Sequence, residues 1–370
     1  MKEVIIITQR ELEIIEILKS NPFVSQQEIA DLLKITRSSV AVHITNLIKK
    51  GIIRGRGYVI DERDHISVIG GANVDIVGYP FEDLRRADSN PGEVNVSIGG
   101  VGRNIAENLA KLGNNTKMFT VVGDDVHGEK IITESVASGI DMSHVKKVVD
   151  SGTGTYLAVL NRENDMDVAI ASMNIFKKLD RKYIEDNKQI ISKSKVIVFD
   201  TNLEEEVLYY AVQLFKDNIL FLDTVSHTKA LRAKKIIGYF HTIKPNRIEA
   251  EALSGMKISG ISDLQKAAKY FHGRGVVNVF ITLGEEGVFY SDGENSGLVK
   301  AKKIVPKNAT GAGDAFQAAL VHGELQHMSI EKKVKFSMAA SILAMSSYST
   351  INPEMSVEKI EETMKNLEEK

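Results

Sequence analysis

The chain of 370 residues contains no cysteine, no tryptophan and only 6 prolines. Without cysteine the protein has no disulfide bond, no thiolate nucleophile and no cysteine-bound metal, and this composition suits a reducing compartment. No apolar run approaches the roughly 20 residues that a transmembrane helix needs. The apolar stretch at residues 4–7 is too short for a signal peptide. We therefore expect a cytoplasmic protein without a membrane partner.

Charge of neither sign dominates, because 47 basic and 49 acidic residues give a formal net charge of −2. Any contact with nucleic acid must then come from a local basic surface rather than from the overall charge. The length exceeds that of a typical single domain. A small module beside one large α/β domain fits this length better than two equal halves do.

The first sixty residues predict three short helices followed by two short strands around a glycine turn at residues 52–60. Capping-box spacing occurs twice, and a third N-cap precedes the last helix. The residues that mark these helix starts are Thr8, Glu11, Ser25, Glu28 and Thr36. This order resembles the winged helix-turn-helix modules of bacterial transcription regulators, so we expect such a domain at residues 1–62.

The resemblance implies that the third helix enters the major groove of DNA. From Lys34 to Ile60 every ionised side chain is basic, which agrees with that interpretation. The residues expected to contact bases or phosphates are Arg37, Ser38, Ser39, His43, Arg54 and Arg56. A module that serves only dimerisation, docking or stabilisation of an oligomer is the alternative, because a fold does not imply a function.

Near the C-terminus, two glycines flank Ala312, and Asp314 follows them directly before the apolar run at residues 315–320. Gly311 and Gly313 let the backbone turn sharply, so that successive N–H groups converge at the start of the next helix. The helix dipole adds partial positive charge there, which favours a phosphoryl group. Asp314 is placed to take a proton from an attacking hydroxyl. This pattern indicates phosphoryl transfer to an alcohol, and a plain helix start with Asp in its first turn is the structural alternative.

Residues 308–314 resemble the C-terminal signature of the PfkB, or ribokinase-like, family of sugar and nucleoside kinases. Residues 99–113 resemble the N-terminal signature of the same family, a glycine pair followed by a helix that contains Asn. The resemblance extends over residues 66–355, approximately. It implies an α/β fold at residues 65–370, with a doubly wound, mostly parallel sheet and a small β lid at about 77–98 and 153–172.

Apolar strand patterns alternate with helical patterns after Gly113, which independently predicts a mostly parallel sheet with helices on both faces. Strands are expected at residues 117–121, 196–199, 219–222, 237–243 and 277–282. Family members use the lid to cover the sugar and commonly also to form a dimer contact. The resemblance therefore implies a homodimer.

The first strand of this domain, residues 66–69, runs into glycines and then polar side chains. This arrangement puts Asn73 and Asp75 at the carboxyl end of a parallel sheet, where α/β proteins bind ligands. A turn cap is the alternative role for Asp75. The resemblance implies substrate binding by Asn73, Asp75, Gly99, Gly100, Arg103 and Asn104.

Asn246 and Glu249 match the Asn-x-x-Glu motif with which the family positions Mg²⁺ and phosphate through water molecules. Hard oxygen ligands suit Mg²⁺, although a helix cap by Asn246 is the simpler alternative. The resemblance further implies ATP binding by Asn246, Thr282, Gly284, Gly287, Gly311 and Gly313. Most relatives have Asp where this chain has Asn308, which leaves open whether it uses the monovalent cation common in the family.

Residues 70–75, 89–92, 99–109 and 223–226, together with Lys229, are most similar to the pseudouridine kinases of this family. The resemblance implies phosphorylation of pseudouridine to pseudouridine 5′-phosphate, with Asp314 as general base and the amides of Gly311, Ala312 and Gly313 as the anion hole. A kinase for inosine, guanosine, cytidine or a sugar remains the nearest alternative. A nucleoside-sensing transcription regulator that binds DNA is an alternative of another class, and both roles could coexist.

Overall fold

The computed structural model describes residues 7–21, 24–53, 65–163, 165–302 and 304–368. The chain divides into two compact units, residues 1–63 and 64–370. Each unit has its own apolar core, so each is described separately.

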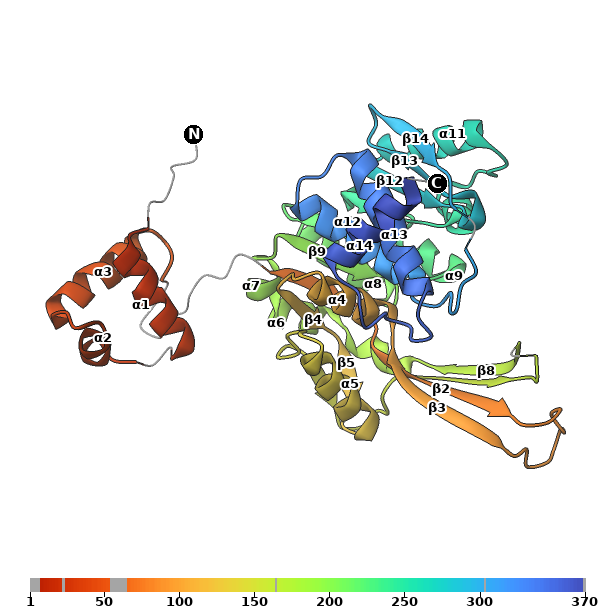
Figure 1. Cartoon of the computed structure of the whole chain (residues 1–370), viewed down its shortest axis with the longest axis horizontal. Helices are drawn as coiled ribbons and strands as arrows, with labels where there is room; N and C mark the ends of the chain where they lie inside the picture. The colour runs from red at the N-terminus through yellow and green to blue at the C-terminus, as the bar shows by residue number, and fades with distance from the viewer. Residues whose placement is uncertain (1–6, 22–23, 54–64, 164, 303, 369–370) are drawn as a thin grey trace. The chain divides into compact units, whose positions relative to one another are not determined.

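Three helices form the smaller unit: α1 (Gln9–Ser20), α2 (Gln26–Leu33) and α3 (Arg37–Lys49) (Figure 1). Both predicted capping boxes are confirmed, with Thr8 pairing Glu11 and Ser25 pairing Glu28. Lys50 at the end of α3 lies 2.7 Å from the buried Glu11 carboxylate at the start of α1. The predicted strand pair at residues 52–60, with Arg54 and Arg56, lies mostly outside the described residues.

An eight-stranded sheet organises the larger unit, in the order β14-β13-β12-β11-β10-β9-β1-β4. Its members are β1 (Ile66–Ile69), β4 (Thr116–Phe119), β9 (Val196–Asp200), β10 (Ile219–Asp223), β11 (Thr242–Ile243), β12 (Asn278–Thr282), β13 (Val288–Ser291) and β14 (Ser296–Val299). Neighbours from β4 to β12 pair in parallel, whereas β13 and β14 add an antiparallel edge. The predicted mostly parallel sheet is thereby confirmed.

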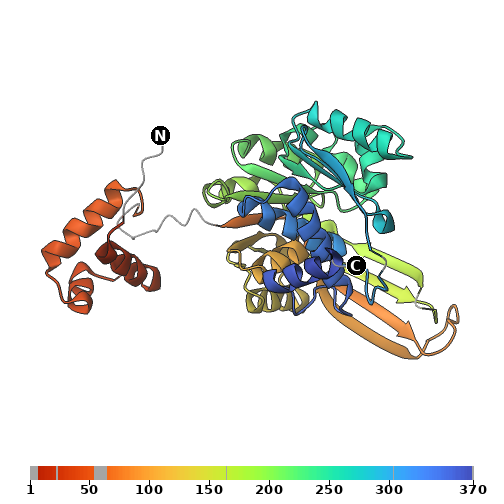
Figure 2. The same cartoon turned by 45° about the horizontal axis from the view of Figure 1, so that its top comes forward.

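Helices cover both faces of this sheet, as Figures 1 and 2 show. The helices of this unit are α4 (Val101–Lys111), α5 (Val126–Ala137), α6 (Arg181–Asp186), α7 (Lys188–Ile191), α8 (Glu205–Leu214), α9 (His227–Ala230), α10 (Arg247–Ser254), α11 (Ile261–His272), α12 (Ala312–Leu325), α13 (Ile330–Met345) and α14 (Val357–Glu368). Of these, α14 packs on α13 and not on the sheet. Alternate residues of β9 enter different cores. Ile197 and Phe199 pack with α6, α8, α10 and α11, and Val196 and Val198 pack with α4, α12 and α13.

A separate four-stranded sheet, in the order β3-β2-β7-β8, projects from the domain (Figures 1 and 2). It consists of β2 (Asn73–Pro80), β3 (Gly92–Gly99), β7 (Thr155–Leu160) and β8 (Met166–Ser172). We call it the lid. Strand β2 follows β1 after three residues, so Asn73 and Asp75 lie at the base of the lid.

Two predicted strands differ from the observed ones. The expected strand at 237–243 is instead the 3-10 helix η3 (Ile237–Tyr239) followed by the two-residue strand β11. Ile236, Ile237 and Phe240 are all buried, and this three- to four-residue spacing is typical of a helical turn, not of a strand. The strand predicted at 117–121 is divided into β4 and β5 (Val121–Gly123), and β5 pairs with β6 (Lys146–Val148).

Candidate active site

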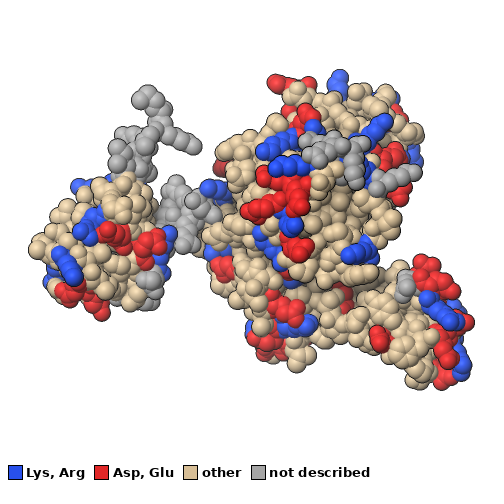
Figure 3. Space-filling model, viewed as in Figure 1, with Lys and Arg blue, Asp and Glu red and all other residues tan. Residues whose placement is uncertain are grey.

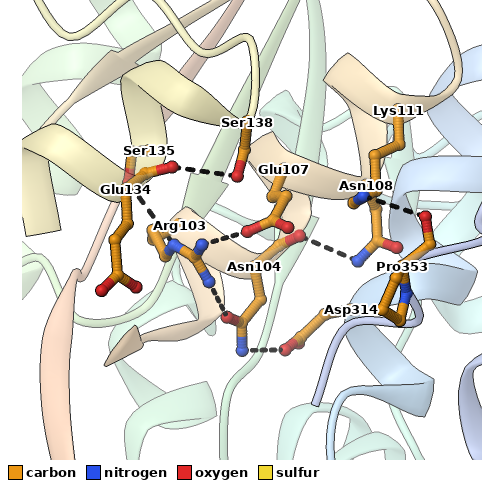
Figure 4. A network of polar contacts seen from close by, with 10 residues as sticks. All are labelled: Arg103, Asn104, Glu107, Asn108, Lys111, Glu134, Ser135, Ser138, Asp314 and Pro353. Carbon is orange, nitrogen blue, oxygen red and sulfur yellow. Dashed lines mark hydrogen bonds and ion pairs between the residues drawn. The ribbon is translucent and has the colours of Figure 1, made fainter. Parts of the chain in front are cut away.

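The predicted site residues gather at the carboxyl ends of β1, β9, β10 and β11, close to the N-termini of α4 and α12. Ligands of open α/β sheets bind at this edge. Asn104 on α4 donates from Nδ2 to Oδ2 of Asp314 on α12 over 2.8 Å (Figure 4). The two sequence segments singled out as signatures, 210 positions apart at this contact, therefore meet in one place.

Asp314 has an unusual environment for a carboxyl group. Burial, together with the negative charges of Asp223 and Asp200, raises its pKa to about 7, and the Asn104 hydrogen bond and the Lys244 ammonium oppose the rise. A carboxylate whose pKa lies near neutral pH is well matched to accept a proton from a hydroxyl group. This geometry gives Asp314 the properties of a general base.

The start of α12 requires glycine. Gly311 has φ of 84°, and a Cβ atom there would lie 2.2 Å from the Thr350 carbonyl oxygen. Among the described residues no side chain caps this helix, so the N–H groups of its first turn, including Ala312 and Gly313, stay available for an anion.

Lys244, which the sequence analysis did not single out, lies beside this helix start. Its Nζ is 3.3 Å from Oδ2 of Asp223 and would be 3.6 Å from a Cβ atom on Gly313. Burial acts to lower its pKa, but the carboxylates of Asp223, Glu249 and Asp314 outweigh that effect and raise the pKa. Lys244 therefore supplies a permanent positive charge next to the available amides.

Asn246 and Glu249 form a capping box at the start of α10, the simpler role that the sequence allowed. Glu249 is buried, and its Oε2 accepts from the Asn246 amide at 2.9 Å and from Oγ1 of Thr224 at 2.6 Å. Its Oε1 remains for a further donor such as metal-bound water. These hard oxygen atoms fit Mg²⁺ held through water, and within the described residues no cluster of three or more acidic or histidine side chains forms a direct metal site.

The residues predicted to bind the nucleotide lie beside Asn246. The Thr282 amide donates to the Pro245 carbonyl at 3.0 Å, and Thr282 forms a bridge with Asn246. Gly284 begins the 3-10 helix η4 (Gly284–Glu286) with φ of 62°, and Gly287 follows it with φ of 113°. The chain thus turns back at the end of β12 next to the motif that begins α10.

At the lid side, Asn73 donates to Oδ1 of Asp75 at 2.7 Å. Burial raises the pKa of Asp75, and the Asn73 hydrogen bond and the Arg103 charge oppose this effect. Gly99 leaves room for the carboxylate, because a Cβ atom there would lie 2.2 Å from Oδ2 of Asp75. Gly100 has φ of 99°, and its missing side chain lets the backbone approach Gly71.

Asp200 is a second residue that the sequence analysis missed. It is buried at the end of β9 and accepts hydrogen bonds from the backbone N–H groups of Gly71 at 2.8 Å, Gly102 at 2.9 Å and Asn202 at 2.9 Å. This carboxylate joins the loop after β1 to the start of α4. An Asp that ends an entirely apolar strand was the available sequence signal.

In the smaller unit, the predicted DNA contacts are distributed over more than one face of α3. Arg37 and Ser38 are exposed, whereas Ser39 is half-buried with its hydroxyl 2.8 Å from that of Thr36, and His43 is also half-buried. Val40, Ile44 and Leu47 point into the core. The outward face of the helix consists of Ser38, Val42, Thr45, Asn46 and Lys49.

None of the helices in the described parts of the chain is long and apolar enough to cross a membrane.

The kinase signatures have independent support from a family comparison. The sequence model of the pfkB family carbohydrate kinases matches residues 63–357, and that of winged helix-turn-helix DNA-binding modules matches residues 7–54.

Two curated Escherichia coli (strain K12) proteins are similar over almost their whole length. The uncharacterized sugar kinase YeiI is 36% identical over 351 residues, which cover 94% of this chain and 97% of the relative. A pseudouridine kinase is 38% identical over 309 residues, which cover 83% of this chain and 98% of the relative.

A solved structure shows the same fold. A Clostridium perfringens protein assigned to the sugar kinases superposes with a TM-score of 0.76 and 38% identity. The match covers 82% of this chain and 96% of that chain.

Proposed function

Because this chain belongs to the pfkB family of carbohydrate kinases, we propose that it transfers the γ-phosphoryl group of ATP to the 5′-hydroxyl of pseudouridine. The broader activity, phosphorylation of a nucleoside or sugar, follows from the family and its relatives. Membership of the family also implies ATP and Mg²⁺.

The observation that carries the proposed chemistry is the hydrogen bond between Asn104 and Asp314. It joins the lid-side residues to a carboxylate whose pKa of about 7 suits a general base. The preference for pseudouridine is supported by the 38% identity with a pseudouridine kinase over nearly the entire length of that enzyme. The similarity at residues 223–226 and Lys229 supports the same choice.

In the proposed reaction Asp314 accepts the proton of the 5′-hydroxyl while the hydroxyl oxygen forms its bond to the γ-phosphorus. The bond from that phosphorus to the ADP oxygen breaks, so the products are the nucleoside 5′-phosphate and ADP. The amides of Ala312 and Gly313 and the Lys244 ammonium stabilise the negative charge that spreads over the phosphoryl oxygens. The protein mainly positions groups and neutralises charge.

The remaining polar groups divide the site into two ends. Asn73 and Asp75 bind the ribose hydroxyls, and the 282–287 segment contacts the nucleotide. Glu249 and Asn246 would hold Mg²⁺ through water, and the ion when bound neutralises phosphate charge. Thr224 fixes the Glu249 carboxylate through its hydroxyl group.

Steady-state assays with Mg²⁺ test the proposal against pseudouridine, uridine, cytidine, inosine, guanosine, adenosine, ribose and fructose. ADP formation and the phosphorylated product are both measured, and Asp314→Asn serves as the matched inactive control. Pseudouridine as the preferred substrate by kcat/KM supports the proposal. Preference for another nucleoside or a sugar contradicts the choice of substrate and keeps the kinase, whereas no turnover on any compound contradicts both.

A second proposed role is DNA binding by the smaller unit. In this role the kinase domain also senses a nucleoside and thereby controls the DNA binding. The match of residues 7–54 to winged helix-turn-helix DNA-binding modules supports it. The exposed Arg37 and Lys49 on α3 would contact phosphates, while Ser38, Val42 and Thr45 would face base edges.

Gel-shift experiments with genomic fragments, with and without pseudouridine, test this role. We expect a sequence preference, and we expect Arg37→Ala to weaken binding to all sequences and to reduce its salt dependence. Binding without sequence preference, or no binding at moderate salt, would leave the module with an oligomer-stabilising role instead.

We also propose a homodimer formed through the lid. One face of the lid is apolar, and its exposed side chains come from three strands: Val94, Val96, Leu157, Val168 and Ile170. The charged side chains of the lid gather mostly at its far end (Figure 3). A second copy that covers this face would remove the apolar surface from water. Analytical ultracentrifugation of the wild-type protein and of the double variant Val96→Glu/Ile170→Glu checks the proposal. We expect a wild-type dimer and a monomeric variant, and a wild-type monomer would contradict the proposal.

The loop before the anion hole supports turnover without a monovalent cation. Nδ2 of Asn308 donates to the Tyr348 carbonyl at 3.1 Å, so a neutral hydrogen bond joins these two loops. Equal kcat in potassium chloride and in choline chloride would agree with this proposal, and strong activation by potassium would contradict it.

A cytoplasmic location, where ATP is abundant, fits the enzyme and its lack of cysteine.

A further inference from the structure

Arg103 is a buried arginine in the N-terminal signature, only 4% exposed. Its guanidinium forms an ion pair with Glu107 one turn further along α4, and Nε lies 3.5 Å from Oγ of Ser135 on α5. Nη1 donates to Oδ1 of Asn104 at 3.3 Å. Figure 4 shows these side chains in one continuous polar network that ends at Asp314.

The side-chain amide of Asn104 has two possible orientations, which exchange its oxygen and nitrogen atoms. Only one of them directs Nδ2 toward Asp314, where it donates at 2.8 Å. A guanidinium group donates hydrogen bonds and accepts none. The donation from Arg103 to Oδ1 therefore selects the orientation in which Nδ2 faces Asp314.

We propose that Arg103, held by Glu107, is a positioning residue that fixes the Asn104 amide so that this amide donates to the catalytic base, and that Arg103 does not bind the substrate directly. The inference rests on the proposed role of Asp314 as that base. It assigns to the buried ion pair a function in the reaction that a purely structural pair would not have.

Several charged groups face the two ends of this network. Glu107 on the same helix, Glu134 on α5 and Asp75 on β2 surround the Arg103 guanidinium. Asp314 faces Asp223 and Asp200 at the strand ends and the Lys244 ammonium. Since a hydrogen bond to a carboxylate favours its charged form, loss of the Asn104 donation raises the pKa of Asp314 further. The acid limb of the pH–rate profile then moves to higher pH.

The test uses the full-length protein and the substrate that the wild-type enzyme consumes. For Arg103→Met we expect kcat at pH 7 to fall about tenfold, the acid limb to move up by about one pH unit, and KM for the nucleoside to change little. Arg103→Lys should recover part of the loss, because an ammonium also donates. Lys111→Met, a change of similar kind at the end of α4, is the matched control and should leave the profile unchanged.

A double-mutant cycle with Asn104→Ala separates positioning from substrate binding. If Arg103 acts through Asn104, the double variant has the kcat of Asn104→Ala alone, since the two losses are not independent. Multiplied losses, or a rise in KM with an unchanged pH profile, overturn the inference. Should Arg103→Met fail to fold, the combined variant Glu107→Gln/Arg103→Lys takes its place in the cycle with Asn104→Ala.

Two results distinguish this inference from the proposed function. If Asp314→Asn retains turnover, the assignment of the base is wrong and the inference falls with it. If Asp314→Asn is inactive and Arg103→Met keeps both the wild-type kcat and the wild-type pH profile, only the role of Arg103 is wrong.

Discussion

At the residue scale, the surroundings of Asp314 set the pH range in which its carboxyl group is ionised. Burial and two neighbouring carboxylates raise its pKa to about 7. A base must be ionised, so turnover should be lost as pH falls through about 7 and should reach a plateau above it. Initial rates of the wild-type enzyme from mildly acidic to mildly alkaline pH check this. A plateau that extends far into the acid range would mean that Asp314 titrates normally.

Replacing Asp314 by Asn should separate turnover from binding. We expect kcat to fall by about 10²- to 10⁴-fold while KM for the nucleoside is largely retained, because the carboxylate acts mainly in the transition state. Single-turnover kinetics and equilibrium binding of the nucleoside measure the two effects. A variant with near-normal kcat would remove Asp314 from the role of base.

The same substitution should stabilise the fold at neutral pH. The pKa of Asp314 is raised from 3.8 to about 7 on folding, so between these values the folded chain retains a proton that the unfolded chain has lost. Stability due to this group therefore falls as pH rises through that window. In thermal melts, Asp314→Asn should gain most over wild type above about pH 7 and little near pH 4.

Contacts between residues close together in the sequence were predictable, whereas contacts between residues on different strands of the sheet were not. The spacing of Asn246 and Glu249 predicted their proximity, which the capping box of α10 brings about. Asp200 and Lys244 lie at the ends of different strands, and their positions depend on the pairing order β11-β10-β9-β1. No spacing along the chain specifies that order.

At the scale of elements, the start of α12 depends on Gly311. A side chain there would adopt an unfavourable positive φ and would collide with the Thr350 carbonyl. Gly113 is the matched control, because it has a similar φ of 78° with nothing within 4 Å of its missing Cβ atom. Gly113→Ala should cost about 1 kcal/mol of stability, with kcat unchanged. Gly311→Ala should lose more stability and most of kcat, and equal effects of the two changes would contradict this account.

Element starts were easier to predict than element types. Thr8 and Ser25 mark the starts of α1 and α2 because capping involves only four consecutive residues. The segment at 237–243 was mispredicted as a strand because apolar residues occupy exposed as well as buried positions there, as at the 40% exposed Tyr239, so the sequence lacks the polar positions that would reveal a period. Gly238 lies there with its Cα against the Arg274 carbonyl, a contact between segments that the local sequence does not reveal.

At the scale of the whole molecule, the two units should unfold separately, because each has its own apolar core. Residues 64–370 alone should retain the kcat of the full chain, since all the candidate residues for phosphoryl transfer lie in that unit. Calorimetry of the full chain should show two transitions, of which one disappears in the shortened protein. Loss of turnover in the folded fragment would show that the smaller unit contributes to catalysis.

The strand order also governs when the enzyme becomes active during its synthesis. The smaller unit makes mostly local contacts and can fold as soon as it leaves the ribosome, whereas β1 must wait for β9, about 130 residues later, to gain its second neighbour. The proposed base arrives later still, since Asn104 meets Asp314 210 positions further along. A nascent chain can thus have a folded smaller unit well before it has a kinase, and if that unit binds DNA as proposed, the contact can precede the first turnover.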